Sequence, residues 1–235
     1  MPNKTFSLND IGEISIYKNK KSRSLKLSIK SDGQVRLTIP FWVTYSTGLL
    51  FIDKNKQWIL DHERPKVSVL CDQQKIGKNH RILFYNRDID KVRSSIKDNY
   101  INIYMPLGMN NNSEEAQEAA IKASKRALKN ESIELIPTRV QDIAAQRGFD
   151  YSSVSLRSLK GRWGSCSSRK ELTFNIFLMQ LPWHLIDYVI IHELVHTKHM
   201  NHSNDFWDEF SLHLENPKVL RREMKGYSPV ISITD

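Results

Sequence analysis

The chain has 235 residues, of which 40% are hydrophobic and 26% charged, a composition typical of a folded globular protein rather than a disordered one. Only two cysteines occur, so no disulfide framework is indicated, and no apolar run approaches the ~20 residues that a membrane-spanning helix needs. The first residues lack the basic and then apolar pattern of a signal peptide, so we expect a cytoplasmic protein with reduced thiols and no membrane partner.

The net charge of +9 is unevenly distributed along the chain. Residues 1–110 hold 19 Lys or Arg against 10 Asp or Glu, whereas residues 111–235 hold 16 of each kind. A basic excess of this size is typical either of a solvated face or of a surface that attracts nucleic acid or another polyanion through phosphate contacts. The sequence favours the solvated face and leaves a nucleic-acid partner as the alternative.

The first half has the pattern of a β-rich region. Alternating apolar residues over 25–29 and 35–39 predict a hairpin with its turn at Ser31-Asp32-Gly33, and Pro40 ends the second strand. The segment Thr47–Leu60 is expected to form a helix. Polar turns separate four further expected strands, over 67–70, 81–85, 92–96 and 100–105.

A stretch of turn-forming residues predicts the domain boundary. Residues 105–112 contain Pro106, Gly108 and a run of asparagines, which are typical of a linker between two folded regions. We therefore divide the chain into a β-rich, basic region over 1–110 and a second domain over 111–235.

The second domain opens with a long helix. Ser113 is its expected N-cap and Gly148 its expected end, and Pro137 predicts a disturbance between them. Downstream, the motif R-W-G-S-C at 162–166 predicts a turn that enters an edge strand. The remaining expected elements are a strand over 172–178, a helix from Ser203 to about Leu214, a basic helix over 218–225 and a final strand over 230–233.

The most informative motif is H-E-L-V-H at 192–196, which lies in a strongly apolar segment that opens with Leu181-Pro182. Residues four apart share one face of a helix, so His192 and His196 can bind one metal ion while the Glu193 carboxylate reaches a water beside it. Zinc activates water for attack, and a carboxylate outside its coordination shell can accept the proton. Because unpaired polar groups are costly in so apolar a helix, the motif predicts a hydrolytic zinc site rather than two core histidines.

A hydrolytic zinc ion usually has three protein ligands, and the candidates for the third are His199, His202, Asp205 and Glu209. On a straight helix His199 would lie roughly 10 Å along the axis from His192. His202 precedes a helix-start signal and is expected in a turn where the chain folds back, so we favour it. Glu209 is the alternative, and it would give the two-histidine and glutamate ligand set of the gluzincins.

The order of motifs beyond the histidines is also informative. R-W-G-S-C at 162–166, a strand that contains Asn175, the H-E-L-V-H motif, Asn201-His202-Ser203 and Phe206-Trp207 follow one another. This order resembles the YgjP-like zinc metallopeptidases, relatives of the SprT-type and WLM-type peptidases. Ser22–Leu25, Pro40 and Trp58-Ile59 extend the resemblance over nearly the whole chain. The resemblance implies one zinc ion per chain, bound by His192, His196 and His202, with Glu193 as the base.

The sequence therefore predicts an α+β protein, with a β-rich amino-terminal half followed by a helical, zincin-like metallopeptidase half with a small sheet. The expected function is zinc-dependent hydrolysis of peptide bonds in a peptide or protein substrate, with Glu193 as general base. Arg162, Tyr188 and His199 are candidates for contacts to the substrate or transition state. The alternative is a nucleic-acid-associated protein whose zinc site is structural, or active only when recruited.

Overall fold

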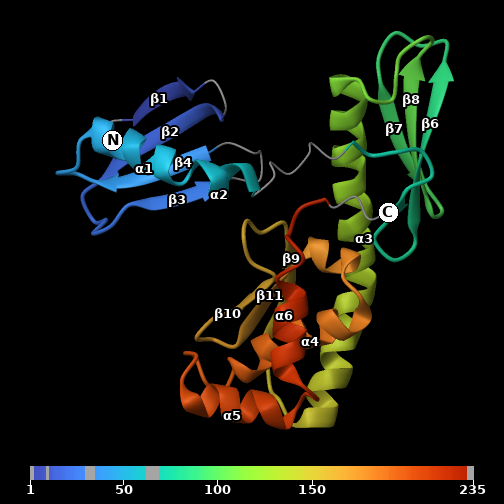
Figure 1. Cartoon of the computed structure of the whole chain (residues 1–235). Coiled ribbons are helices and arrows are strands. Elements are labelled where there is room, and N and C mark those ends of the chain that lie inside the picture. The colour runs from blue at the N-terminus through green and yellow to red at the C-terminus, as the bar shows by residue number, and fades with distance from the viewer. Residues whose placement is uncertain (1–2, 9–10, 30–34, 62–68, 232–235) are drawn as a thin grey trace. The chain divides into compact units, whose positions relative to one another are not determined.

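Figure 1 shows the computed structural model of the chain, which describes residues 3–8, 11–29, 35–61 and 69–231. The chain folds into two compact units, Met1–Ser68 and Val69–Asp235. This division lies earlier than the boundary expected after residue 110. The physical reason is that strands which follow residue 69 contribute Ile82 and Ile103 to one core with the long helix of the second unit.

The first unit is a four-stranded sheet with two short helices. Its strand order is β1-β2-β4-β3, where β1 is Asn3–Leu8, β2 is Gly12–Asn19, β3 is Lys26–Ile29 and β4 is Val35–Pro40. β2 and β4 are parallel, whereas β1 and β3 pair antiparallel with their neighbours. Alternate residues of the two central strands face one side and form an apolar core that includes Ile14, Ile16, Leu37 and Ile39.

The predicted hairpin of this unit is present as β3 and β4, although its turn at Ser31–Gly33 lies outside the described residues. The single helix expected over Thr47–Leu60 is instead two helices, α1 (Tyr45–Lys54) and α2 (Lys56–Asp61). They are separated at Asn55, whose side-chain amide donates a 2.7 Å hydrogen bond to the carbonyl of Phe51. β1 and β2 were not expected, because their apolar alternation is short.

The second unit begins with a sheet of strand order β5-β6-β8-β7, formed by β5 (Lys75–Ile76), β6 (His80–Arg87), β7 (Arg93–Lys97) and β8 (Tyr100–Pro106). The last three strands were expected, and the two-residue β5 was not. Val69 and Leu70 are not in a strand, and the other half of the strand expected over 67–70 lies outside the described residues.

The 34-residue helix α3 (Glu114–Arg147) supports the rest of the second unit. As predicted, the Ser113 side chain caps it by accepting from the backbone N–H of Ala116, and Gly148 ends it with a φ of 68°. Pro137 lies inside the helix without ending it. Figure 1 shows the β5–β8 sheet along the first part of α3, and the elements that carry the histidine motif along its last part.

The second unit contains another small sheet, which follows α3 in the chain and has the strand order β10-β11-β9. Its strands are β9 (Ser153–Arg157), β10 (Gly164–Cys166) and β11 (Glu171–Asn175). Among the described strands β10 pairs with β11 alone, so it is the edge strand that the R-W-G-S-C motif predicts. The strand expected over 172–178 ends at Asn175 and continues as the 3₁₀ helix η1 (Ile176–Gln180), because the Asn175 side chain accepts from the N–H of Phe177.

Three helices complete the described chain: α4 (Trp183–Val195), α5 (Asn204–Leu212) and α6 (Pro217–Met224). Val230 and Ile231 are not in a strand, and the rest of the strand expected over 230–233 lies outside the described residues. Three small sheets and six α-helices in the described residues confirm the predicted α+β class. No described helix is long and apolar enough to span a bilayer.

A buried carboxylate ties the first sheet of the second unit to α3. Glu131, with 1% of its surface exposed, accepts from the backbone N–H groups of Lys78 (2.7 Å), Asn79 (2.9 Å) and His80 (3.2 Å). Its Oε1 also lies 2.5 Å from Nδ1 of His80. We call this group, Glu131 with residues 78–80, the Glu131 clasp.

The Glu131 clasp is continuous with the start of α4. The Lys78 ammonium donates to the carbonyl of Leu181 and lies 4.8 Å from the ring centroid of Trp183. One turn further along α4, Asp187 forms a two-pronged ion pair with Arg139 of α3, at 2.8 and 2.5 Å. These contacts hold the helix that carries the histidine motif in place.

Candidate metal centre

The helix α4 is buried on nearly every side, and its last turn carries the histidine motif. His192 lies in α4, and His196 is its C-cap residue one turn later. The backbone tightens after His196, where the N–H groups of Thr197 and Lys198 bond to the carbonyls three residues earlier, at 2.9 and 3.0 Å. Because the helix ends here, the chain can turn back toward the same face, which a straight helix could not do.

A hydrogen bond orients the ring of His196. Its Nδ1 lies 2.9 Å from the carbonyl oxygen of His199, and since a carbonyl can only accept, Nδ1 must donate. The other nitrogen, Nε2, therefore carries a free lone pair. Such a bond from the second ring nitrogen is what usually fixes the tautomer of a metal-binding histidine.

The turn after α4 brings His202 to the other two histidines. His202 precedes Ser203, the N-cap residue of α5, and its Nε2 lies 3.0 Å from Nε2 of His192. The ligand atoms of His192, His196 and His202 all lie within 4.8 Å of one another. Among the described residues, this is the one group of three potential ligands close enough to hold a metal ion.

The chemistry of this group fits a metal that prefers nitrogen ligands. Burial lowers the pKa of His192 to about 3, and it also lowers the pKa of His196. Both rings are therefore neutral near pH 7, which is the form that binds a cation. Three imidazoles and no carboxylate suit zinc, whereas magnesium and calcium prefer oxygen ligands.

Aromatic side chains of α5 form the floor beneath the three imidazoles. Phe206 is fully buried, and its ring centroid lies 5.0 Å from that of His192, 4.6 Å from His196 and 4.7 Å from His202. Trp207 stacks against His202 at 5.6 Å. This packing orients His192, because its Nδ1 is buried and has no hydrogen-bond partner among the described residues.

Glu193 lies beside the histidines with 6% of its surface exposed. It faces Gly164 of β10 so closely that a Cβ atom at residue 164 would lie 2.7 Å from Oε1 of Glu193. Burial raises the pKa of Glu193 to about 8, and the positive charge of Arg162 partly opposes this increase. A cation on the histidines would oppose it further, so the carboxylate is poised to exchange a proton near neutral pH.

Asn175 positions the loop that carries Arg162. Its buried side-chain amide donates to the carbonyls of Leu159 and Arg162, both at 2.8 Å, and its backbone N–H donates to Trp163. The predicted contact residue Arg162 is exposed, and its charge acts on Glu193. One buried amide therefore holds the loop that leads into β10.

The other predicted contact residues lie in different places. The Tyr188 ring stacks 6.4 Å from His192, and burial raises the pKa of its phenol. His199 contributes its carbonyl to His196, as described above, and its ring is not part of the three-histidine group. The alternative ligand Glu209 instead pairs with Lys198 at 2.6 Å and with His213 at 3.2 Å.

One residue near the histidines, Arg221, was not expected from the sequence. Arg221 of α6 lies 5.1 Å from the ring centroid of Trp207, and its positive charge acts on both His192 and Tyr188. Cys166 of β10 lies near Glu193, and burial raises the pKa of its thiol to about 11, so it is not a thiolate at neutral pH. No local sequence pattern indicates Arg221, because α6 follows the motif by a full helix and two turns.

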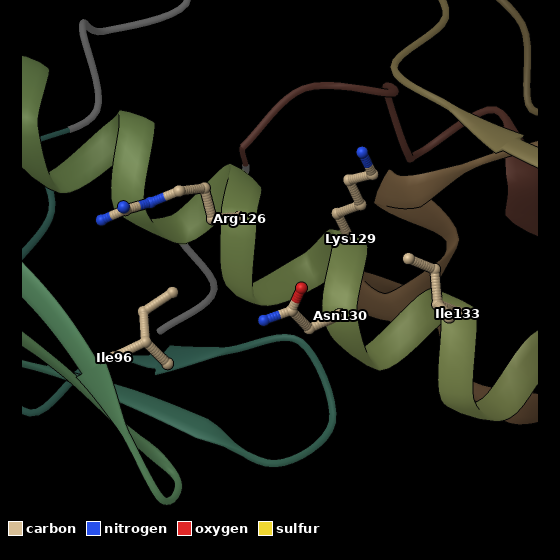
Figure 2. A pocket seen from close by; sticks show the side chains of 5 residues that line it. All are labelled: Ile96, Arg126, Lys129, Asn130 and Ile133. Carbon is tan, nitrogen blue, oxygen red and sulfur yellow. The ribbon is translucent and has the colours of Figure 1, made fainter.

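A pocket of about 480 Å³ elsewhere in the second unit does not belong to this centre. Figure 2 shows its five lining side chains, one from β7 and four from α3: Ile96, Arg126, Lys129, Asn130 and Ile133.

A model of the YgjP-like metallopeptidase domain matches residues 23–227. The chain belongs to the YgjP-like metallopeptidase family. The resemblance seen in the motifs is thereby confirmed, and a YgjP-like metallopeptidase is a metal-dependent hydrolase of peptides or proteins. No curated protein matches this YgjP-like chain.

Two solved structures are similar to parts of this YgjP-like chain. One is the metallopeptidase zymogen of Pyrococcus abyssi abylysin, at 24% identity and a TM-score of 0.35, covering 39% of this chain and 94% of that one. The other is the metallopeptidase zymogen of Methanocaldococcus jannaschii jannalysin, at 25% identity and a TM-score of 0.34, covering 38% and 91%.

Proposed function

We propose that the protein is a zinc-dependent peptidase in which His192, His196 and His202 bind one zinc ion per chain and Glu193 is the general base. The observation that carries the proposal is the convergence of three imidazole nitrogens within 4.8 Å beside the buried carboxylate of Glu193. Three protein ligands leave a zinc ion one open position, which suits catalysis better than the closed four-ligand set of a structural site.

The reaction follows from the positions of these groups. Zinc, when bound, polarises the scissile carbonyl and makes water a stronger acid. Glu193 accepts the proton of the attacking water and passes it to the departing amine, so that one carboxylate serves as base and then as acid. Burial raises the pKa of this carboxyl, whereas the charge of Arg162 and that of a cation on the histidines oppose the increase, so the group can both accept and release a proton.

Charged and phenolic groups on two sides of the histidines are candidates to stabilise the transition state. Tyr188 and Arg221 lie on the His192 side and can donate hydrogen bonds to a carbonyl oxygen as it becomes negative. Arg162 lies on the Glu193 side, where its charge favours the ionised base. We assign no such role to His199.

The edge strand β10 supports an extended peptide as substrate. One edge of β10 has no partner strand among the described residues, and Gly164 places this strand directly against Glu193. A peptide that pairs with this edge through its backbone lies beside the base. Backbone pairing reads little of the side chains, so the protein is expected to accept many sequences.

Metal analysis and mutation test the proposal. Purified protein should contain one zinc ion per chain, and Glu193→Gln should keep that zinc while losing hydrolysis of a quenched fluorescent peptide library. His202→Ala should lose zinc, whereas Glu134→Gln, which changes an exposed glutamate of α3, should alter neither property. Undiminished turnover by Glu193→Gln removes Glu193 from the mechanism, and full zinc content in His202→Ala removes His202 from the site.

A further inference from the structure

Lysine and aromatic side chains lie close together at one end of the sheet in the first unit. β2 and β4 are parallel, with Lys18 opposite Ile39 and Asn19 opposite Pro40. The carboxyl ends of both strands therefore lie side by side at the same end of the sheet. The residues that follow them, Lys20 on one side and Phe41 and Trp42 on the other, are therefore brought together. β1 adds Lys4, and α1 starts at the same place with Tyr45.

Direct contacts hold this group together. The Lys18 ammonium donates a 3.2 Å hydrogen bond to the carbonyl of Phe41 and lies 5.8 and 5.1 Å from the ring centroids of Phe41 and Tyr45. The Lys20 ammonium lies 5.7 Å from the Phe41 centroid, and that of Lys4 lies 5.1 Å from the Tyr45 centroid. We call this group, together with Trp42, which follows Phe41 in the chain, the aromatic–lysine surface; its members are Lys4, Lys18, Lys20, Phe41, Trp42 and Tyr45.

Two rings of the aromatic–lysine surface, Phe41 and Trp42, are exposed within this unit, whereas Tyr45 packs partly against its core. Phe41 is 52% exposed and Trp42 is 67% exposed, although both follow a strand whose own apolar residues are buried. Large aromatic side chains at adjacent exposed positions gain nothing for the core of the unit. They are suited to contact a flat partner.

No acidic side chain that the structure describes lies at this end of the unit. Residues 14–52 contain seven Lys or Arg and a single acid, Asp32, which lies outside the described residues. Among the described side chains of the unit, Glu13 lies opposite Ser7 at the other end of β2, and Asp53 lies in the last turn of α1, about 12 Å along the helix from Tyr45. No described acid of the unit therefore compensates the positive charge of the surface, and this charge complements a polyanion.

We propose that the aromatic–lysine surface binds single-stranded nucleic acid, with bases stacked on Phe41 and Trp42 and phosphates held by Lys4, Lys18 and Lys20. Unpaired bases expose their faces to such rings, whereas the bases of a duplex are already stacked on one another. An anionic bilayer fits less well, because ammonium groups within 6 Å of the Phe41 and Tyr45 centroids would be carried toward the hydrocarbon with those rings. This proposal is independent of the peptidase mechanism.

Fluorescence anisotropy of the whole chain tests the proposal, with a labelled 20-nucleotide oligothymidylate and a 20-base-pair duplex as probes. The single strand should bind more tightly than the duplex. If three phosphates are contacted, raising the salt concentration from 50 to 200 mM should weaken binding of the single strand roughly 20-fold.

Variants of the surface separate stacking from charge. Trp42→Ala should weaken binding about ten-fold at either salt concentration, and Trp42→Phe should restore most of it. Lys20→Gln should reduce the salt dependence by about one phosphate contact.

A matched pair of control variants lies in the second unit. Lys97 and Tyr100 are an exposed lysine and an exposed aromatic that face each other across β7 and β8, so Lys97→Gln and Tyr100→Ala should leave binding unchanged. Equal affinity for strand and duplex, or salt-sensitive binding that ignores Trp42→Ala, would overturn the proposal in favour of unspecific charge attraction. Trp42-dependent binding to phosphatidylserine vesicles without binding to the oligonucleotide would assign the surface to a membrane instead.

Discussion

Two glutamates of the second unit, Glu131 and Glu193, are both buried in helices, yet their surroundings differ completely. Glu131 accepts three backbone hydrogen bonds and contacts His80, whereas no donor among the described residues bonds to Glu193. Each also lies against a glycine, because a Cβ atom at Gly77 would lie 2.2 Å from Oε2 of Glu131 and one at Gly164 would lie 2.7 Å from Oε1 of Glu193.

This difference distinguishes a carboxylate with a structural role, Glu131, from one that is suited to catalysis, Glu193. Burying a carboxylate is costly, and the Glu131 clasp offsets that cost with backbone N–H groups, so its role is to hold β6, α3 and α4 together. For Glu193 the charge of Arg162 offsets only part of the cost, and burial still raises the pKa of this carboxyl. A group kept in this state is available to a proton or to a water molecule, as a general base must be.

The largest expected effect is the loss of peptidase activity when Glu193 is replaced. Glu193→Gln should lower the rate of peptide hydrolysis by about 10² to 10⁴, the usual contribution of general base catalysis. The same variant should not lower the free energy of unfolding, since a neutral amide replaces an unsatisfied acid. Peptide turnover and urea denaturation measure the two effects. A marked loss of stability would place Glu193 with Glu131 as a structural residue.

Glu131 should respond in the opposite way. Glu131→Ala leaves one buried and two partly buried N–H groups without their acceptor and should lower the free energy of unfolding by about 3 to 5 kcal/mol. Urea denaturation followed by tryptophan fluorescence measures the change. Glu134→Ala, an exposed neighbour on α3, should change it by less than about 0.5 kcal/mol. Equal effects of the two variants would show that the clasp contributes nothing.

Removal of zinc should destabilise the chain around the three histidines and leave the Glu131 clasp unchanged. At a free zinc concentration 100 times its Kd, zinc adds about 2.7 kcal/mol to stability, and a chelator should remove that amount. Hydrogen exchange should then quicken in the last turn of α4 and in residues 197–203, while residues 78–80 at the Glu131 clasp keep their protection. Faster exchange throughout the second unit would mean that zinc stabilises the whole fold.

The two glycines should give the smallest effects and sharpen the comparison. Gly77→Ala combines a φ of +68° with a contact to Glu131 and should cost about 1 to 3 kcal/mol of stability without changing the catalytic groups. Gly164→Ala has no such backbone strain, and its new methyl group should displace Glu193 and lower kcat instead. Thermal unfolding and steady-state kinetics separate the outcomes. Unchanged kcat in Gly164→Ala would show that Glu193 tolerates a different position.

Much of this protein can be predicted from the sequence because the relevant signals are local. The four-residue spacing of His192 and His196 places them on one helical face, and the helix-start signal at Ser203 places His202 in a turn. The caps of α3 and the edge strand at Gly164 follow from equally short patterns. Neighbouring residues decide each of these features, and the structure places them as expected.

The tertiary structure alone decided the features that join distant segments. Glu131 meets Lys78 across 53 positions, and Arg221 reaches the histidines from a helix that carries no recognisable motif. The division of the chain at Ser68, rather than after residue 110, depends on packing of strands against α3. Burial and neighbouring charge determine what a side chain can do, and both are set by residues that become neighbours only when the chain folds.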